Sequence, residues 1–252
     1  PNQFVMMISN SNEKKTALAK FKNYETPLKK IDSFKKSVWG IRPKNKEQNF
    51  ALDLLMDPDV PLVSIIGKAG SGKTLLALAS GLQQCFGETA NDTRYRRVIV
   101  TKPVEPVGKD IGFLPGTMEE KMLPWLAPIQ DNLKNLMGND KLTLDMYMEE
   151  GKIEVEAMTY IRGRSIANAY IIIDEAQNMT KHEIKTVLTR VGEGTKVILT
   201  GDIEQIDNVY LDETSNGLTY VIEKFKEQSM SGHITLIKGE RSKVATLSSK
   251  LL

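Results

Sequence analysis

The fold is decided by residues 62–78, LVSIIGKAGSGKTLLAL, where a short apolar run leads into a glycine-rich turn and then a helical pattern. Gly67 opens the turn, four residues follow, and Gly72, Lys73 and Thr74 close it. The spacing Gly-x-x-x-x-Gly-Lys-Thr is that of a phosphate-binding P-loop, which requires a strand before it and a helix after it. Both are present here, so the sequence predicts a phosphate site rather than an ordinary glycine-rich turn that matches by chance.

The residue types of this loop suit the chemistry. Glycines let the backbone curl with its N–H groups pointing inward, and the following helix adds its positive N-terminal end. Lys73 can reach the β- and γ-phosphates, and the Thr74 hydroxyl can bind magnesium. We therefore expect the nucleotide to be held by the whole loop, Gly67, Lys68, Ala69, Gly70, Ser71, Gly72, Lys73 and Thr74.

The composition of the 252 residues is that of an ordinary globular protein, with 26% charged and 6% aromatic residues. No apolar run approaches the ~20 residues of a membrane span, and no segment has the pattern of a secretory signal. The single cysteine, Cys85, excludes an intrachain disulfide framework and fits a reducing compartment. We expect a cytoplasmic protein with no membrane partner and, because His182 and His233 have no ligand at metal spacing, no zinc site.

The charge is distributed unevenly along the chain. Residues 1–46 hold eleven Lys and Arg against three Asp and Glu, although the net charge of the chain is only +2. This pattern predicts a basic N-terminal extension over residues 1–44 and a single domain over residues 45–252. The extension is either a nucleic-acid-binding arm or a solvated leader. Its lysine-rich part contains four aromatic residues, Phe21, Tyr24, Phe34 and Trp39. In a nucleic-acid-binding arm they would stack on bases. Alternatively, this part forms a helix whose aromatic side chains pack on the core.

Strand and helix patterns alternate along the chain. The expected strands lie at residues 4–8, 62–66, 97–101, 153–157, 170–174, 196–200 and 234–238. The expected helices lie at 45–55, 73–86, 117–137 (interrupted at Pro124 and Pro128), 181–191, 215–228 and 242–251. Continuous apolar strands between helices predict an α/β fold, a mostly parallel sheet covered by helices on both faces. Functional groups should then gather at the carboxyl ends of the strands.

Two carboxylates follow the apolar run YIII. Asp174 ends that run, in the position from which a P-loop protein holds magnesium, usually through its water shell. Glu175 can orient and deprotonate a water for attack on the γ-phosphate, which favours hydrolysis over transfer to a small substrate. The alternative is that the two carboxylates only cap a helix N-terminus.

Two glutamines are further candidates. The run 196–200 leads into Gly201, and four residues later Gln205 stands where P-loop proteins with an extra strand carry a γ-phosphate sensor. Gln48 lies on a helix before the P-loop that could bring its amide to the adenine edge. Either could instead be a solvent-exposed glutamine. The segment from Thr101 lacks the aspartate of a GTP-specific Asn-Lys-x-Asp motif, which favours ATP.

In these motifs and in several others, the chain resembles the PhoH-like ATPase family over about residues 45–245. The words that carry the resemblance are Thr101-Lys102-Pro103-Val104, Gly112-Phe113-Leu114-Pro115-Gly116, Glu120-Lys121, Tyr160-Ile161-Arg162-Gly163-Arg164, Asp174-Glu175-Ala176-Gln177-Asn178, Leu188-Thr189-Arg190 and Gly201-Asp202-Ile203-Glu204-Gln205-Ile206-Asp207. The resemblance implies a single RecA-like core related to superfamily 1 helicases, ATP hydrolysis with Mg²⁺, and a ring-forming, hexameric assembly. It also implies that Gln48 contacts the adenine side and Gln205 the γ-phosphate.

The chain departs from the family pattern in two ways. Members often carry a fused nuclease domain of the PIN type, and no stretch of this chain has room for one, so we expect no nuclease activity from it. The family loop usually begins Gly-Pro-Ala-Gly-Thr, whereas this loop has Lys68 and Ser71 in place of the proline and threonine. These changes alter the local charge but remove no required backbone group.

A single core of this length has no second lobe to supply an arginine finger, so we expect the finger from a neighbouring subunit. Arg241, which follows the last expected strand, matches an arginine near the C-terminal end of the family's sequence pattern. The alternative is that Arg241 forms an ion pair on the surface. A head-to-tail contact of this kind closes into a ring. We therefore expect a homo-oligomer with Arg241 acting in trans.

The functional hypothesis is ATP hydrolysis coupled to the binding or unwinding of RNA or DNA. The expected partner is single-stranded nucleic acid, with RNA favoured over DNA. Lys102, Arg162 and Arg164 are candidates for phosphate-backbone contacts, although the two arginines could serve the subunit interface instead. The alternative is a nucleotide-gated binding or regulatory module with slow turnover and no motor activity. A small-molecule kinase is disfavoured by Glu175 and by the lack of an arginine-rich lid.

Overall fold

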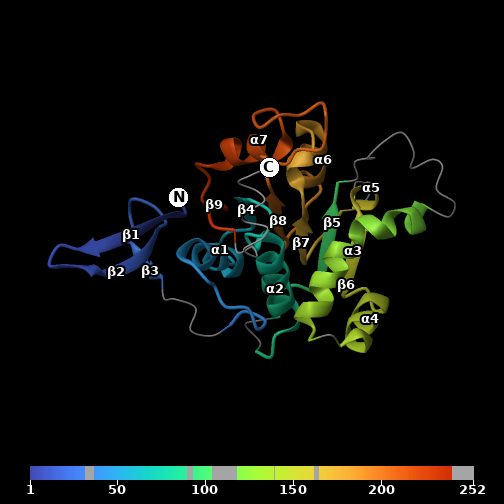
Figure 1. Ribbon diagram of the computed structural model, residues 1–252, viewed down its shortest axis with the longest axis horizontal. Helices are drawn as coiled ribbons and strands as arrows, with labels where there is room; N and C mark the ends of the chain where they lie inside the picture. The colour runs from blue at the N-terminus through green and yellow to red at the C-terminus, as the bar shows by residue number, and fades with distance from the viewer. Residues whose placement is uncertain (32–36, 90–92, 104–117, 139, 162–164, 240–252) are drawn as a thin grey trace, which may run out of the picture.

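The computed structural model describes residues 1–31, 37–89, 93–103, 118–138, 140–161 and 165–239 (Figure 1). At its centre is a six-stranded sheet of order β6-β5-β7-β8-β4-β9, in which all neighbouring strands run parallel. The strands are β4 (Leu62–Gly67), β5 (Arg97–Lys102), β6 (Ile153–Ala157), β7 (Ala169–Ile173), β8 (Lys196–Gly201) and β9 (Ser231–Leu236).

Successive strand residues enter two separate cores. In β7, Tyr170 and Ile172 belong to one buried cluster and Ile171 and Ile173 to the other, and all four are at most 1% exposed. Helices cover the first face with α1 (Lys46–Met56), α2 (Lys73–Phe86), α3 (Met118–Leu136) and α4 (Lys141–Glu149). They cover the second face with α5 (Met158–Ile161), α6 (Lys181–Leu188) and α7 (Gly217–Phe225). The expected parallel α/β fold, covered on both faces, is therefore confirmed.

The strand order places the predicted motifs side by side. β8 pairs with β4 on one side and with β7 on the other, so one strand separates the P-loop strand from the strand that ends before Asp174. β8 is therefore the extra strand that the interpretation of Gln205 as a γ-phosphate sensor assumes. Because the three strands are parallel, the segments that follow Gly67, Ile173 and Gly201 leave the sheet at the same edge.

Helix α3 differs from the expectation. It runs without a break through Pro124 and Pro128, where the sequence suggests interruptions. Its inner side buries Leu126, Ile129 and Leu133 in the core of the first face. Tertiary packing of an apolar stripe outweighs the hydrogen bonds that two prolines remove.

Other element boundaries also differ. Helices α4 and α5 are additional to the expected elements, and β9 begins at Ser231, three residues before the expected start. The helix expected over residues 242–251 lies outside the described residues. Among the described residues, none of the helices has the length and hydropathy needed to cross a bilayer.

Residues 3–31 form a three-stranded antiparallel sheet, here called the N-terminal sheet, which projects beside α1 (Figure 1). Its strands are β1 (Gln3–Ser9), β2 (Asn12–Phe21) and β3 (Lys29–Ile31). The strand expected over residues 4–8 lies within β1. The alternative of a helix in the lysine-rich segment is wrong for the described residues, because a tight turn at Asn10 and Ser11 folds β2 back onto β1 and supplies a pairing partner.

The aromatic residues of the N-terminal segment have different fates. Trp39 packs on the core: its indole Nε1 donates to the Leu136 carbonyl at 3.0 Å, and its backbone N–H donates to the Gln83 side chain at 2.9 Å. Tyr24 is 97% exposed and meets Phe21 edge-on, with ring centroids 5.1 Å apart. Phe34 lies outside the described residues.

Candidate nucleotide site

The P-loop joins the end of β4 to the start of α2. Gly70 and Gly72 have φ angles of 78° and 91°, in the left-handed region that favours glycine. A Cβ atom at Gly67 would lie 2.8 Å from the Leu236 carbonyl oxygen, so only glycine fits there. Local backbone sterics therefore explain why glycine stands at these three positions of the loop.

Lys73 begins α2 and is 8% exposed. Its Nζ donates to the Gly67 carbonyl at 2.5 Å and to the Lys68 carbonyl at 3.3 Å. The ammonium is thus held against the loop by two of the loop's own carbonyls. A phosphate in the loop would meet this charge at short range.

Three oxygen-bearing side chains meet at the end of β7. The Thr74 hydroxyl donates to Asp174 Oδ1 at 2.9 Å, and the Thr200 hydroxyl donates to the same oxygen at 2.5 Å. Asp174 is 8% exposed, and its backbone N–H donates to the Thr101 carbonyl at 2.9 Å. A carboxylate beside a threonine hydroxyl is a donor set that suits Mg²⁺, so Thr74 and Asp174 could hold this ion. In the part of the chain that the structure describes, no group of three or more His, Cys, Asp or Glu side chains could hold a metal.

Glu175 follows in a strained conformation. Its φ angle is 55°, in the left-handed region that non-glycine residues seldom adopt. The residue is half-buried, and its Oε2 accepts a hydrogen bond from Gln177 Nε2 at 2.8 Å. The turn that Glu175 makes leads directly into a short 3-10 helix, η1 (Ala176–Asn178).

Gln177 connects Glu175 to the segment after β8. The side chain is 1% exposed, and Nε2 also donates to the Gln205 carbonyl at 2.8 Å. Its Oε1 accepts from the Asp202 N–H at 3.1 Å. A Cβ atom at Gly201 would lie 2.6 Å from this Oε1, so glycine is needed there for the amide to approach.

Asp202 connects the same segment to the P-loop. The residue is 3% exposed; its Oδ2 accepts from the Ala69 N–H at 2.9 Å and its Oδ1 from the Glu204 N–H at 3.1 Å. Lys68, the departure from the family loop, forms an exposed ion pair with Glu204 at 2.8 Å. The bond from the Ala69 N–H to the Asp202 carboxylate and the ion pair of Lys68 therefore join the P-loop to the segment that follows β8.

Gln48 lies against the P-loop rather than on the surface. It is 5% exposed, and its Nε2 donates to the Ser71 carbonyl at 3.0 Å while its Oε1 accepts from the Lys44 N–H at 2.8 Å. The helix start is set by Asn45, whose side chain caps α1 by accepting from the Gln48 N–H at 2.9 Å. Gln48 thus joins the first turn of α1 to the phosphate loop.

Two adjoining cavities share the border formed by Gly70, Gly72 and Leu75. One, of about 340 Å³, is lined among others by Lys73, Thr74, Asn132, Glu175, Asp202 and Gln205. The other, of about 310 Å³, is lined among others by Gly40, Ile41, Arg42, Lys44 and Gln48. Together they form one cleft that runs along both sides of the P-loop. A larger cavity of about 490 Å³, between the N-terminus, α7 and β9, contains none of the predicted site residues.

Of the four remaining predicted site residues, the structure describes one, Lys102. Lys102 ends β5 and is half-buried at the same edge of the sheet as Asp174. Arg162, Arg164 and Arg241 lie outside the described residues.

The sequence reasoning did not single out Gln177, Thr200 or Asp202 as site residues, although their contacts tie this site together. Gln177 and Asp202 stand within the motifs that carry the family resemblance, and Thr200 ends an expected strand. Spacing alone does not show which of these neighbours points into the site.

Comparison with known proteins identifies the family. The model of the PhoH-like protein family matches residues 40–247. Protein PhoH2 of Bacillus subtilis is 53% identical over 254 residues, covering 100% of this chain and 57% of the relative. Protein PhoH2 of Thermobispora bispora is 39% identical over 218 residues, covering 86% of this chain and 48% of the relative.

The chain thus spans about half the length of the curated relatives it matches, and the expectation of no nuclease activity concerns these 252 residues alone. Among solved structures, Pif1 helicase from Candida albicans aligns with a TM-score of 0.41 at 14% identity, over 83% of this chain and 43% of that chain. The extent of the family match and the 53% identity decide the assignment. The chain belongs to the PhoH-like protein family, and its fold is that of a P-loop NTPase.

Proposed function

We propose that this protein hydrolyses ATP to ADP and phosphate. The observation that carries the proposal is the position of Glu175, which lines the same cavity as Lys73 and Gln205 and is held in a strained turn by Gln177. Strained backbone at a candidate base is consistent with a preorganised catalytic group. A module that only bound nucleotide would have no need of a carboxylate held in this way.

We assign the roles as follows in this proposal. The P-loop amides and Lys73 bind the β- and γ-phosphates, and Thr74 and Asp174 would hold Mg²⁺, which would neutralise phosphate charge. Glu175 accepts a proton from a water molecule, whose oxygen bonds to the γ-phosphorus as the bond from that phosphorus to the ADP oxygen breaks. Gln205, which lines the same cavity, contacts the γ-phosphate and the water.

We propose that the adenine occupies the second cavity, beside Gln48. This cavity adjoins the one that Lys73 lines, as the length of a nucleotide requires, and Gln48 lines it. In this proposal residues 45–252 form the ATPase domain and residues 1–44 form a basic extension.

The wider activity rests on the family resemblance. We propose a homo-oligomeric ring, hexameric as the resemblance implies, in which Arg241 completes the site of the next subunit. Hydrolysis is coupled to the binding of single-stranded nucleic acid, with RNA preferred to DNA. Lys102, Arg162 and Arg164 contact the phosphate backbone of the nucleic acid. Lys102 supports this role because it lies at the edge of the sheet where the site is built.

A second candidate, a nucleotide-gated module with slow turnover, is favoured by one observation. The Ala69 N–H donates to Asp202, and the Lys73 ammonium donates to loop carbonyls. A phosphate that accepts the Ala69 N–H would replace the Asp202 carboxylate as its partner. Nucleotide entry would then rearrange the contact between the two loops, which is how a binding switch operates.

The deciding experiment measures ATP turnover, with and without a panel of single-stranded RNA and DNA, on protein whose mass in solution is known. We expect turnover that nucleic acid stimulates, that Lys73→Ala abolishes, and that is accompanied by RNA binding that weakens steeply with salt. Turnover without stimulation favours the gated module. Turnover unchanged in Lys73→Ala would show that it does not come from this site.

A further inference from the structure

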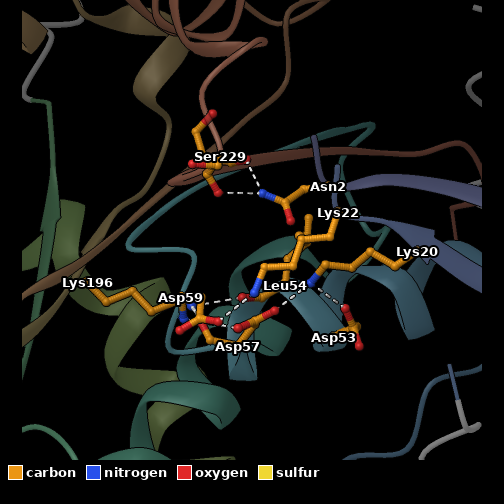
Figure 2. A network of polar contacts seen from close by, with 10 residues as sticks. Asn2, Lys20, Lys22, Asp53, Leu54, Asp57, Asp59, Lys196 and Ser229 are labelled. Atoms are coloured by element: carbon orange, nitrogen blue, oxygen red, sulfur yellow. Dashed lines mark hydrogen bonds and ion pairs between the residues drawn. The ribbon is translucent and has the colours of Figure 1, made fainter. Parts of the chain in front are cut away.

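Two buried lysines from different parts of the chain hold the C-terminal end of α1 (Figure 2). Lys20, on β2 of the N-terminal sheet, is 2% exposed, and its Nζ lies 2.9 Å from Asp53 Oδ2 and 2.6 Å from Asp57 Oδ2. Lys196, the first residue of β8, donates from Nζ to the Leu54 and Asp57 carbonyls at 2.8 and 2.7 Å. The end of the helix is therefore held from the N-terminal sheet and from the central sheet.

The energetics of these contacts make the position of the helix specific. A buried ammonium is costly unless carboxylates or carbonyls surround it, so displacement of α1 would leave Lys20 without compensation. Burial alone would raise the pKa of the Asp57 carboxyl, but the hydrogen bond and charge of Lys20 outweigh it and hold that pKa below its usual value. Phe4 of β1 adds a stacked contact with Phe50 of α1, with ring centroids 4.5 Å apart.

The first turn of the same helix carries Gln48, whose amide donates to the Ser71 carbonyl of the P-loop. The helix is eleven residues long, so displacement of its C-terminal end is transmitted to its first turn. A Cβ atom at Gly72 would lie 3.2 Å from Gln48 Nε2, which shows how closely this side chain approaches the loop. A continuous series of contacts thus leads from Lys20, through α1, to the phosphate loop.

We propose that Lys20 is a positioning residue for the nucleotide site: it fixes α1, and through Gln48 it sets the P-loop in its nucleotide-binding conformation. The N-terminal sheet is then part of the nucleotide-binding machinery, although none of its residues lines the two cavities of the cleft. This inference rests on the proposed function, because it assigns a determinant of affinity to the same site.

The chain supplies a matched control on the same sheet. Lys22 lies two residues after Lys20 and pairs with Asp59 at 2.9 Å, but both side chains are more than half exposed. An exposed ion pair contributes little to stability or to the position of a helix. Lys20→Met and Lys22→Met remove the same charge and keep similar stems, so they differ in burial and in the contact with α1.

The test is a titration of each folded variant with a fluorescent, non-hydrolysable ATP analogue in the presence of Mg²⁺. We expect Lys20→Met to raise the Kd about tenfold, an effect typical of coupled residues, and Lys22→Met to change it less than twofold. In a Gln48→Ala background, Lys20→Met should change the Kd less than twofold, because its route to the loop is already removed. A general loss of stability would instead weaken binding equally in both backgrounds.

Two results would overturn the inference: a wild-type Kd in Lys20→Met, or the same fold-change with and without Gln48. If Lys20→Met does not fold, Asp53→Asn keeps the Asp57 pair and should raise the Kd several-fold, again only when Gln48 is present. If the wild-type protein itself binds no nucleotide, the proposed function fails. If the wild-type protein binds and the variants match it, only the role of Lys20 fails.

Discussion

Gln177 Nε2 lies 2.8 Å from Glu175 Oε2 and 2.8 Å from the Gln205 carbonyl oxygen, so one buried amide joins the candidate base to the candidate sensor segment. The same side chain accepts the N–H of Asp202, whose carboxylate accepts the N–H of Ala69 in the P-loop. The segments after β4, β7 and β8 are thus linked by side-chain hydrogen bonds. A change at one of them should alter the others.

The first prediction concerns Glu175 itself. Glu175→Gln keeps the size of the side chain and one oxygen that can accept from Gln177 Nε2, but it removes the base, so kcat should fall by about 100-fold or more. Nucleotide affinity should stay close to that of the wild type. The measurement pairs phosphate release with nucleotide titration, and Glu193→Gln, at an exposed turn position before β8, is the control. Normal turnover in Glu175→Gln would show that another group accepts the proton.

Gln177→Ala tests whether the buried amide acts through Glu175. Gln177 does not line the cavity, so we expect kcat to fall about tenfold with little change in KM. The same substitution in a Glu175→Gln background should cause no further loss, because the group it orients is already inactive. Steady-state kinetics of the four proteins complete the cycle. Additive losses would mean that Gln177 acts independently of Glu175.

Thr200→Val tests the contact that supports the magnesium ligand. The substitution keeps the side-chain shape and removes one of the two hydroxyl donors to Asp174 Oδ1. Loss of a partner that orients a metal ligand typically weakens metal affinity 10–100-fold, so the half-saturating Mg²⁺ concentration for turnover should rise about tenfold.

Thr195→Val is the matched control for Thr200→Val. It removes a buried hydroxyl just before β8 begins, where the Thr195 hydroxyl bonds to the Ile166 carbonyl and the Ala169 N–H, away from the predicted site. Mg²⁺ titrations of both variants should separate the local effect from a general loss of stability. Equal shifts in the two would contradict a specific role for Thr200.

Lys196 should make stability depend on pH. Burial lowers the pKa of Lys196 to about 7, although Asp57 and Asp53 oppose the shift; Lys20 and Arg94 lower it further. Below about pH 7 both states carry the proton and the folded state bears the full burial cost. Between about pH 7 and 10 the unfolded state binds a proton that the folded state lacks, so the free energy of unfolding should rise by about 1 kcal/mol per pH unit.

The check is urea unfolding of wild type and Lys196→Met at several pH values between 6 and 9.5. The variant should lose this rise, whatever its absolute stability, because methionine does not titrate. The difference between the two proteins isolates Lys196 from other groups, such as the buried Cys85, whose raised thiol pKa acts in the opposite direction above about pH 9. A constant difference across this range would contradict a shifted Lys196.

The proposed finger in trans is tested by mixing subunits. Arg241→Ala and Lys73→Ala should each be inactive alone, because one lacks the donated arginine and the other cannot hold the phosphates. In a mixed ring, a Lys73-bearing site faces an Arg241-bearing neighbour at some interfaces, so part of the activity should return. ATP turnover as a function of the mixing ratio measures this. Absence of any recovery would leave the assignment of Arg241 to the neighbouring subunit's site unsupported.

The local elements that carry the chemistry could be predicted from the sequence. The P-loop follows from glycine spacing, because Gly67, Gly70 and Gly72 satisfy backbone requirements that no other residue meets as well. The apolar runs that became β7 and β8 are buried on both faces, which is why they read as continuous hydrophobic segments and predict the parallel sheet.

Which residues near the motifs contact one another could not be predicted without the three-dimensional structure. Gln177 is joined to the Gln205 carbonyl, Thr200 to Asp174 and Asp202 to Ala69, between segments that lie far apart in the sequence. The N-terminal sheet and its attachment to α1 through Lys20 were likewise not readable, because lysine spacing does not show which ammonium is buried. Side-chain partners across a sheet depend on strand order and register, which arise from the packing of the whole chain.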